Sequence, residues 1–352
     1  MSTKIISGSN LELATQISST LQIPLTPRKI TQFRNGEICV SIQESVRNHD
    51  VFIVQTKGPS QSTNDMLMEL LILIDACRRS AAKSIYVVLP CYPYARQDKK
   101  EESREPITAK LVANLLAAAG MTRLIVMDLH AAQIQGFFDL PVDNIYSVGL
   151  VRDYLQSYVF PTALTASMTS STPMTPTTPP TTQLSSPKPQ SPVAKKFVLV
   201  SPDAGATKRT LKFGKILSLP TIIMHKQRDY SRPNTIEQIT IIGDASQYQG
   251  KTAIILDDMI DTAGTLVAAV ESLHSNGIQN VICVVTHGIL SHPALERINN
   301  CPALTNVIVS DSLDQTKNLE LCPKLRVFPI GPLLGRAIDS IINNYSMASL
   351  FT

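Results

Sequence analysis

Residues 252–265 read TAIILDDMIDTAGT, in which an apolar run ends on two carboxylates and continues into a loop of small and hydroxyl-bearing residues. A second stretch of the same character, RLIVMDLHAAQIQG, occupies residues 123–136. Each stretch indicates a buried β-strand, an acidic turn and a following helix. Their repetition predicts two similar α/β halves.

Short apolar runs rich in β-branched residues recur along the chain, at residues 4–9, 51–56, 84–90, 123–130, 197–203, 221–226, 239–244, 252–258, 281–288 and 306–312. Amphipathic stretches of helical length, such as 64–80 and 108–120, lie between many of them. Strands that alternate with helices favour parallel sheets flanked by helices. With 352 residues and 43% hydrophobic content, the chain is long enough for two domains of about 150 residues.

The composition argues against several classes of partner. Lys and Arg exceed Asp and Glu by 32 − 28 = 4, a balance too mild to indicate a nucleic-acid or membrane surface. The six cysteines form no CxxC pair and mostly sit in apolar runs, which is typical of reduced structural thiols. No signal peptide and no apolar run near the roughly 18 residues of a membrane span is visible. We expect a cytoplasmic protein with no nucleic-acid and no membrane partner.

One segment, at about residues 161–194, differs in character from the rest. Between Pro161 and Pro192, 23 of 32 residues are Ser, Thr or Pro. Such a segment has too few apolar side chains to offset the entropy lost when it becomes ordered. We predict a disordered insertion. Five of its hydroxyl residues precede proline and are candidates for proline-directed phosphorylation, although an inert solvated loop is an equal alternative: Thr172, Thr175, Thr178, Ser186 and Ser191.

The 252–265 stretch carries the most specific chemistry. A Gly- and Thr-containing turn that leads into a helix presents backbone N–H groups and the positive end of the helix dipole to a phosphate. The paired carboxylates Asp257 and Asp258 suit vicinal ribose hydroxyls and can hold Mg²⁺ through water. The loop residues that complete the motif are Asp261, Thr262, Ala263, Gly264 and Thr265. The alternative is an acidic strand-to-helix turn capped by Asp261.

Asp128 and His130 end the other apolar run two residues apart, so in an extended chain both point to the same side. Asp139 and Asp143 follow and could add carboxylates. Oxygen ligands with one imidazole suit Mg²⁺ that shares its coordination shell with substrate phosphates. A structurally satisfied histidine is the alternative.

Cations and a further acid follow other strand-like runs. The loop YARQDKKEESREP could neutralise a triphosphate through Arg96, Gln97, Lys99, Lys100 and Arg104, although a solvated charged loop is the common explanation. Lys226 and Arg228 could stabilise charge on a transferring phosphoryl group. Asp203 could complete a metal site, face a sugar hydroxyl or cap a helix.

Taken together, these motifs resemble the ribose-phosphate pyrophosphokinase family, also called phosphoribosyl pyrophosphate (PRPP) synthetase. The resemblance covers almost the whole chain apart from the insertion. It rests on FRNGE, ESVR, NDMLMELL, YPYARQDKK, DLHAAQIQGFFDLPVD, SPDAG, HKQR, LDDMIDTAGT and THGILS, in that order.

The resemblance implies two phosphoribosyltransferase-type domains, each a mainly parallel sheet flanked by helices. Residues 1–148 would form the ATP and metal side, residues 149–340 the ribose 5-phosphate side, and 341–352 a tail. It also implies a dimer or hexamer, or a hetero-oligomer with related subunits. The implied reaction is attack of the ribose 5-phosphate anomeric hydroxyl on the β-phosphorus of MgATP, which releases AMP.

Site roles follow from the same resemblance. Phe33, Asn35 and Glu37 of a neighbouring subunit would contact adenine, and Arg96, Gln97, Asp98, Lys99, Lys100 and His130 would hold the rest of ATP. Asp203, Asp257, Asp258 and the 261–265 loop would hold ribose 5-phosphate. Mg²⁺ is associated with Asp128, His130, Asp139, Asp143 and Asp203. Lys226, Arg228 and His130 would be catalytic.

The sequence also departs from the family pattern. Glu101, Glu102 and Glu105 replace a more basic segment, which puts phosphate activation in doubt. Ala206 stands where the family has a second glycine, and residues 229–231 are less basic than usual. The remaining candidates for a regulatory phosphate site are Arg47, Arg104, Asn144, Ser310 and Ser312.

Three other functions remain open at this level. A non-catalytic associated subunit would keep the fold but generally lose the HKQR and DTAGT motifs, both of which are present. A phosphoribosyltransferase that consumes PRPP would not need the motifs of the first half. A transcription regulator would add a DNA-binding region and a basic face, and neither is visible.

Overall fold

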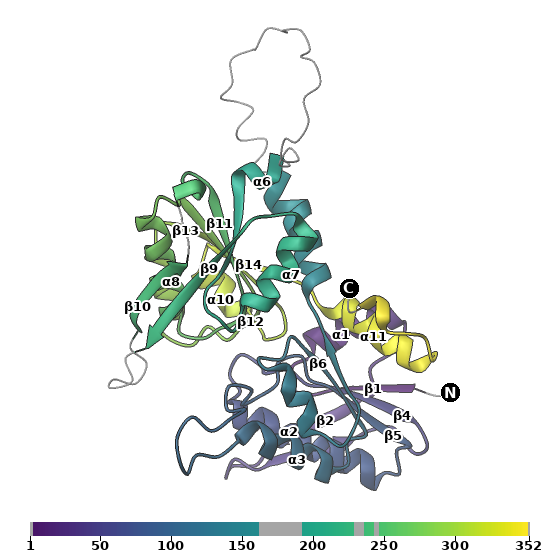
Figure 1. The fold of residues 1–352 in the computed structure, drawn as a ribbon. Coiled ribbons are helices and arrows are strands. Elements are labelled where there is room, and N and C mark those ends of the chain that lie inside the picture. The colour runs from purple at the N-terminus through teal and green to yellow at the C-terminus, as the bar shows by residue number, and fades with distance from the viewer. Residues whose placement is uncertain (1–2, 162–191, 229–235, 243–245, 351–352) are drawn as a thin grey trace, which may run out of the picture.

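The structure is a computed structural model that describes residues 3–161, 192–228, 236–242 and 246–350. Two sheets, one from each half of the chain, are each flanked by helices (Figure 1). The predicted α/β class with mainly parallel sheets is confirmed. No helix of the described segments is both long and apolar enough to cross a membrane.

The first sheet contains five parallel strands. In spatial order they are β1 (Thr3–Ser7), β4 (Asp50–Val54), β5 (Ser84–Val88), β6 (Arg123–Met127) and β7 (Val142–Ile145). Its helices are α1 (Glu12–Leu21), α2 (Thr63–Arg79) and α3 (Thr108–Ala119), with a 3₁₀ helix at Ala132–Phe137. A separate antiparallel hairpin, β2 (Arg28–Gln32) and β3 (Ile38–Ile42), packs against α2.

The second sheet contains seven strands. In spatial order they are β10 (Ile236–Ile242), β9 (Thr221–Arg228), β8 (Phe197–Ser201), β11 (Thr252–Ile260), β12 (Asn280–Gly288), β13 (Leu304–Ser310) and β14 (Leu325–Phe328). Only the β9–β10 pair is antiparallel. The helices are α7 (Thr207–Leu217), α8 (Gly264–Ser275), α9 (Ala294–Asn299) and α10 (Thr316–Leu321).

The two sheets repeat one topology. The order β1-β4-β5-β6-β7 recurs as β8-β11-β12-β13-β14, and β9 and β10 extend the second sheet beyond β8. Two similar halves were predicted from residues 123–136 and 252–265, but these stretches are not equivalent. Residues 123–127 form β6, the fourth strand of its sheet, whereas residues 252–260 form β11, the second strand of the repeated unit. Similar local patterns arise because every buried parallel strand is apolar and ends at a polar turn.

The halves exchange one helix each. Helix α4 (Val148–Tyr154) follows β7 but packs on α7, and a π-helical turn (Leu155–Val159) continues it. Helix α11 (Gly331–Ile342) follows β14 but packs on α1, so the chain ends on the first half (Figure 1). The domain boundaries expected from the sequence were different: they placed residues 149–340 in the second half and a tail at residues 341–352.

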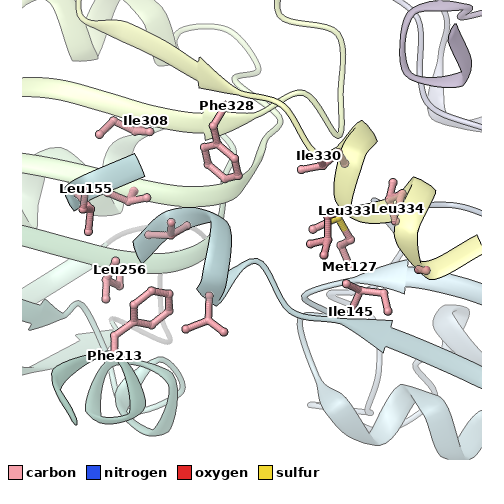
Figure 2. Packing of buried hydrophobic residues seen from close by; sticks show 14 of the residues in the cluster. Met127, Ile145, Leu155, Phe213, Leu256, Ile308, Phe328, Ile330, Leu333 and Leu334 are labelled. Carbon is pink, nitrogen blue, oxygen red and sulfur yellow. The ribbon is translucent and has the colours of Figure 1, made fainter. Parts of the chain in front are cut away.

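Close approach explains where α11 docks. A Cβ on Gly335 would lie 2.7 Å from Thr20 Cγ2 of α1, so only glycine fits there without a shift. The apolar face of α11 contributes Leu333 and Leu334 to the same cluster as Met127 and Ile145 (Figure 2). Residues of the second half, including Phe213 and Phe328, belong to this cluster too, which therefore joins the halves.

The expected insertion lies mostly outside the described residues, as do its five candidate phosphorylation sites. At its edges the chain is ordered: Pro161 is helical, and α6 (Pro192–Lys196) leads directly into β8. Residues 192–194 are thus helical, not part of a disordered segment. A short 3₁₀ helix, Ala348–Leu350, follows α11 near the end of the chain.

Candidate active site

The carboxyl-terminal edges of the two sheets face each other, and a polar site forms between them. His130, three residues beyond β6, brings its Nδ1 within 2.7 Å of Asp258 Oδ2 on β11. The His130 side chain is 39% exposed, whereas that of Asp258 is 9% exposed. The two stretches that the sequence singled out therefore meet, one from each half.

Charge couples this pair. Asp258 raises the pKa of His130 by accepting its hydrogen bond. Burial opposes ionisation of Asp258, but the hydrogen bond and charge of His130 outweigh burial and hold the pKa of Asp258 below its usual range. Each partner therefore favours the charged form of the other. Arg209 of α7, which the sequence analysis did not select, adds positive charge near Asp258.

The pKa of Asp257 shifts in the opposite direction. Burial raises its pKa well above the usual carboxyl value, and the charges of Asp258 and Asp203 raise it further. Asp203 follows β8, the neighbour of β11, and its Oδ1 accepts the N–H of Ala206, the residue before α7. Three of the predicted carboxylates thus share one strand edge, where a cation or a hydroxyl donor would relieve their repulsion.

The 261–265 loop is held from both halves. Arg96 Nη2 lies 2.7 Å from Asp261 Oδ2, and Arg297 of α9 donates to the carbonyl of Thr262 at 2.9 Å. Burial opposes ionisation of Asp261, but Ser291 and Arg96 outweigh it and lower its pKa. Ala263 has a φ of 58°, in the left-handed region, and α8 begins at the next residue. The loop therefore ends at a helix N-terminus, the arrangement expected of a phosphate-binding turn.

The remaining predicted nucleotide residues are mostly exposed. Gln97, Lys99 and Lys100 are open to solvent, and Lys99 forms a surface ion pair with Glu101 at 3.3 Å. Asp98 is half-buried and lies close enough to His130 to add to the rise in its pKa.

The turn of the β2–β3 hairpin carries the three residues expected to contact adenine. Phe33 is 60% exposed, and the turn is stabilised by its own hydrogen bonds, including one from Glu37 N–H to Asn35 Oδ1.

The five residues associated with Mg²⁺ do not come together. Asp128 is 3% exposed and accepts hydrogen bonds from Ser147 N–H at 3.1 Å and Thr286 Oγ1 at 2.6 Å. Asp143 pairs with Arg123 at 3.0 Å, and Asp139 is exposed. Within the described part of the chain, no three His, Cys, Asp or Glu residues are placed to hold a metal. Asp203 and His130 remain near the acidic strand edge.

The two cations expected to be catalytic lie on β9. Lys226 pairs with Ile239, and Arg228 with Ile236, in the antiparallel β9–β10 ladder. Their side chains are outside the described residues.

The regulatory candidates are separated within one chain. Arg47 is exposed and precedes β4, at the amino-terminal edge of the first sheet, and Arg104 is exposed in the loop before α3. Asn144, Ser310 and Ser312 are buried near the opposite edge. Asn144 Oδ1 accepts the N–H of Leu129, and Ser310 Oγ donates to the carbonyl of Thr286 at 2.5 Å.

A buried polar network that was not predicted from the sequence joins the halves. Thr286 and His287, at the end of β12, are each 2% exposed and contact Asp128 and Met127, the residue after β6 and its last residue. Burial disfavours the imidazolium of His287, but the neighbouring Cys91 and Asp128 outweigh that penalty and raise its pKa to about 9. The available signal was the motif THGILS, which was used for the resemblance without a role for its members.

Fold and site together define a duplicated phosphoribosyltransferase-type protein: two parallel α/β units whose strand edges enclose an acidic strand end and a helix-terminal loop. The sequence matches two protein-family models. Residues 3–120 match the N-terminal domain of ribose phosphate pyrophosphokinase, and residues 222–352 match the phosphoribosyl synthetase-associated domain.

Full-length relatives agree with these matches. Ribose-phosphate pyrophosphokinase A of Dictyostelium discoideum is 40% identical over 351 residues, which cover 99% of this chain and 98% of the relative. Ribose-phosphate pyrophosphokinase 1 of Streptococcus agalactiae is 41% identical over 344 residues, covering 98% and 95%. The crystal structure of phosphoribosylpyrophosphate synthetase from Mycobacterium smegmatis superposes with a TM-score of 0.80 at 37% identity, covering 98% of this chain and 100% of that one. The chain belongs to the ribose-phosphate pyrophosphokinase family.

Proposed function

We propose that this chain is a ribose-phosphate diphosphokinase that makes PRPP from ATP and D-ribose 5-phosphate and releases AMP, for use in nucleotide biosynthesis. The observation that carries the proposal is the contact between His130 and Asp258, which joins the nucleotide motifs of the first half to the ribose motif of the second. A phosphoribosyltransferase that consumes PRPP would not need this junction.

The acidic strand end and its loop suit ribose 5-phosphate. Asp257 and Asp258 can accept hydrogen bonds from two neighbouring ribose hydroxyls. The backbone N–H groups of the 261–265 loop and the N-terminus of α8 can hold the 5-phosphate. Because Arg96 and Arg297 brace this loop, it can bind the phosphate with little rearrangement.

The cations around His130 suit the ATP phosphates. In the proposed reaction, the anomeric hydroxyl oxygen of the ribose loses its proton and forms a bond to the β-phosphorus. The bond from that phosphorus to the oxygen of the α-phosphate breaks, which releases AMP. Negative charge grows on the leaving oxygen. A protonated His130 and Arg96 can stabilise this charge, as can Lys226 and Arg228 if β9 brings them to the site.

Mg²⁺ fits this reaction as a substrate-bound cation. Mg²⁺ usually takes one or two carboxylates together with substrate phosphates and water, so it does not require a closed protein cage. The crowded carboxylates Asp203 and Asp257 offer such ligands. The raised pKa of Asp257 indicates that a cation bound at this strand edge would be stabilised. When bound, Mg²⁺ would neutralise the ATP phosphates and make the β-phosphorus more electrophilic.

Oligomerisation is part of the proposal. Phe33 is exposed on the β2–β3 turn, so its ring can stack on adenine in the site of a neighbouring subunit. Either a homo-oligomer, as a dimer or hexamer, or a hetero-oligomer of related subunits would place it so. The alternative of a non-catalytic associated subunit is not favoured, because the relatives that match over the whole chain are named pyrophosphokinases.

The test is formation of PRPP and AMP by the purified full-length chain from MgATP and ribose 5-phosphate, followed by ³¹P NMR. We expect equal amounts of both products and none after Mg²⁺ is removed with a chelator. Lys226→Ala should abolish turnover, whereas Lys29→Ala, on the hairpin strand β2, should retain it. Release of ADP, or a folded and assembled chain that makes neither product, would contradict the proposal.

A further inference from the structure

His287 occupies the centre of the interface between the halves without belonging to the site described above. It lies on β12 beside β11, where its register partner is Met259, the residue after Asp258. Its side chain points across the interface, and its Nε2 lies 3.1 Å from the carbonyl oxygen of Met127, the last residue of β6. Since a carbonyl only accepts, Nε2 carries the hydrogen in this contact.

The segment that His287 contacts is a strained turn. Asp128, which follows Met127, has a φ of 38°, a conformation that residues other than glycine rarely adopt. This turn directs the chain from β6 toward His130. A strained turn persists only if surrounding contacts hold it.

Thr286 holds the same turn from the same strand. Its Oγ1 donates to Asp128 Oδ2 at 2.6 Å, and Ser147 N–H donates to the same oxygen at 3.1 Å. Thr286 and His287 thus contact consecutive residues of the turn, one through a side chain and the other through the backbone. All four of Asp128, Ser147, Thr286 and His287 are at most 4% exposed.

The far side of His287 is also fixed. Its Nδ1 lies 2.9 Å from Ser312 Oγ, and the carbonyl of Ser312 accepts a hydrogen bond from Thr56 Oγ1 of the first half at 2.6 Å. Contacts at both nitrogens therefore fix the orientation of the imidazole ring. A rigid donor is what is needed to set a neighbouring backbone with sub-ångström accuracy.

From this geometry we infer that His287, supported by Thr286, is a positioning residue that fixes the turn at residues 127–130 and so sets His130 against Asp258. This inference rests on the proposed function, because it assigns His287 a role in the proposed transfer. His287 does not touch the reacting groups. Its effect passes through the backbone of Met127.

Two matched pairs of variants test the role. His287→Met removes the donor at nearly equal length, and His287→Gln keeps an N–H donor. Thr286→Val removes the hydroxyl at equal volume, and Thr286→Ser keeps it. We expect His287→Met and Thr286→Val to lower kcat about 100-fold with little change in KM, since a misplacement of about 1 Å can have that effect. His287→Gln and Thr286→Ser should restore most of the rate, and His274→Gln, on the last turn of α8, should match the unaltered chain.

A second readout does not depend on activity. Amide hydrogen exchange at residues 128–130 should rise in His287→Met and Thr286→Val, because the turn loses a contact that holds it, and should stay near that of the unaltered chain in His287→Gln and Thr286→Ser. If unaltered protein makes no PRPP but this change in exchange occurs, the proposed function fails while the positioning link stands. Loss of kcat under threefold in both donor-deleting variants, with unchanged exchange at residues 128–130, would overturn the inference.

Discussion

In the first half, β4 is followed by Gln55 and Thr56, whereas β11, at the equivalent place in the second half, carries Asp257 and Asp258. Gln55 is fully buried and donates to Glu69 Oε1 at 3.0 Å, and Thr56 donates to the carbonyl of Ser312. The neutral pair is used for hydrogen bonds within the first half and between the halves. The acidic pair instead faces the site, where its charges repel each other.

A duplicated backbone provides two equivalent strand edges. One of them can stabilise the fold while the other binds the substrates. The hydrogen bonds that Gln55 and Thr56 donate lower the free energy of the folded state. A crowded acidic edge raises that free energy, but it can bind cations and hydroxyls. Function and stability are therefore divided between the halves, and substitutions at equivalent positions should affect different properties.

The largest expected difference is in activity. Asp258→Asn should lower kcat/KM about 100- to 1000-fold, because it removes both a ribose acceptor and the carboxylate that raises the pKa of His130. Thr56→Val, at the equivalent position, should lower it less than tenfold and instead destabilise the fold by about 1–2 kcal/mol, since the Ser312 carbonyl loses its donor. Steady-state kinetics and urea unfolding measure the two effects. Equal losses of activity would contradict the division of roles.

The exchanged helices should show a similarly large effect on stability. Leu334→Ala on α11 should destabilise the protein by about 2–5 kcal/mol, because Leu334 is fully buried. Since α11 packs on α1, hydrogen exchange should rise first in the first half, far from the substituted residue in sequence. Leu155→Ala, in the turn that continues α4, should raise exchange in the second half instead. Leu321→Ala, at a side chain 64% exposed, is the control and should have little effect.

A smaller effect should have the opposite sign at the acidic edge. Asp257→Asn should stabilise the fold on the order of 1 kcal/mol at neutral pH, a rise of about 2 °C in Tm, while it lowers activity. The pKa of Asp257 is raised in the folded state, so ionisation of this carboxyl destabilises the fold once the pH exceeds its pKa in the unfolded chain. Near pH 3 the carboxyl is protonated in both states, so the stabilisation by Asp257→Asn should vanish there. Gln55→Glu, which puts a carboxylate beside Glu69, should destabilise instead. A Tm unchanged by Asp257→Asn between pH 3 and 8 would refute this.

The smallest expected effect concerns the pair across the site. Because the folded-state pKa of His130 is raised, its ion pair contributes stability that is present at pH below the unfolded histidine value and lost as pH rises through the folded one. His130→Gln should therefore destabilise by about 1 kcal/mol or less at pH 5–6, and by less above pH 8, since the side chain is partly exposed. His49→Gln, at the opposite sheet edge, serves as the reference in the same pH series.

Much of the fold could be predicted because the signal is local. All ten apolar runs form strands, and the stretches 64–80 and 108–120 correspond to α2 and α3. The strands β2, β3, β7 and β14 were not predicted, since they are short or lack a continuous apolar run. The contact of His130 with Asp258 was not predicted, because the resemblance gave the two residues separate roles, in ATP and ribose 5-phosphate binding, without pairing them. The roles of Thr286 and His287 could not be predicted, because a buried Thr or His in an apolar strand looks like any other core residue.

The sequence by itself determined the strands and their polar ends, because side-chain periodicity and the chemistry of Asp257, Asp258 and the 261–265 loop are properties of short stretches. Tertiary structure alone decided which strands are equivalent, that α4 and α11 change halves, and that His287 meets the backbone of Met127. These arrangements depend on contacts between residues far apart in the sequence, from more than fifty positions for α4 and α7 to more than three hundred for α1 and α11. An amphipathic helix specifies an apolar face but not its partner, and only steric fit, such as that of Gly335 against Thr20, selects one.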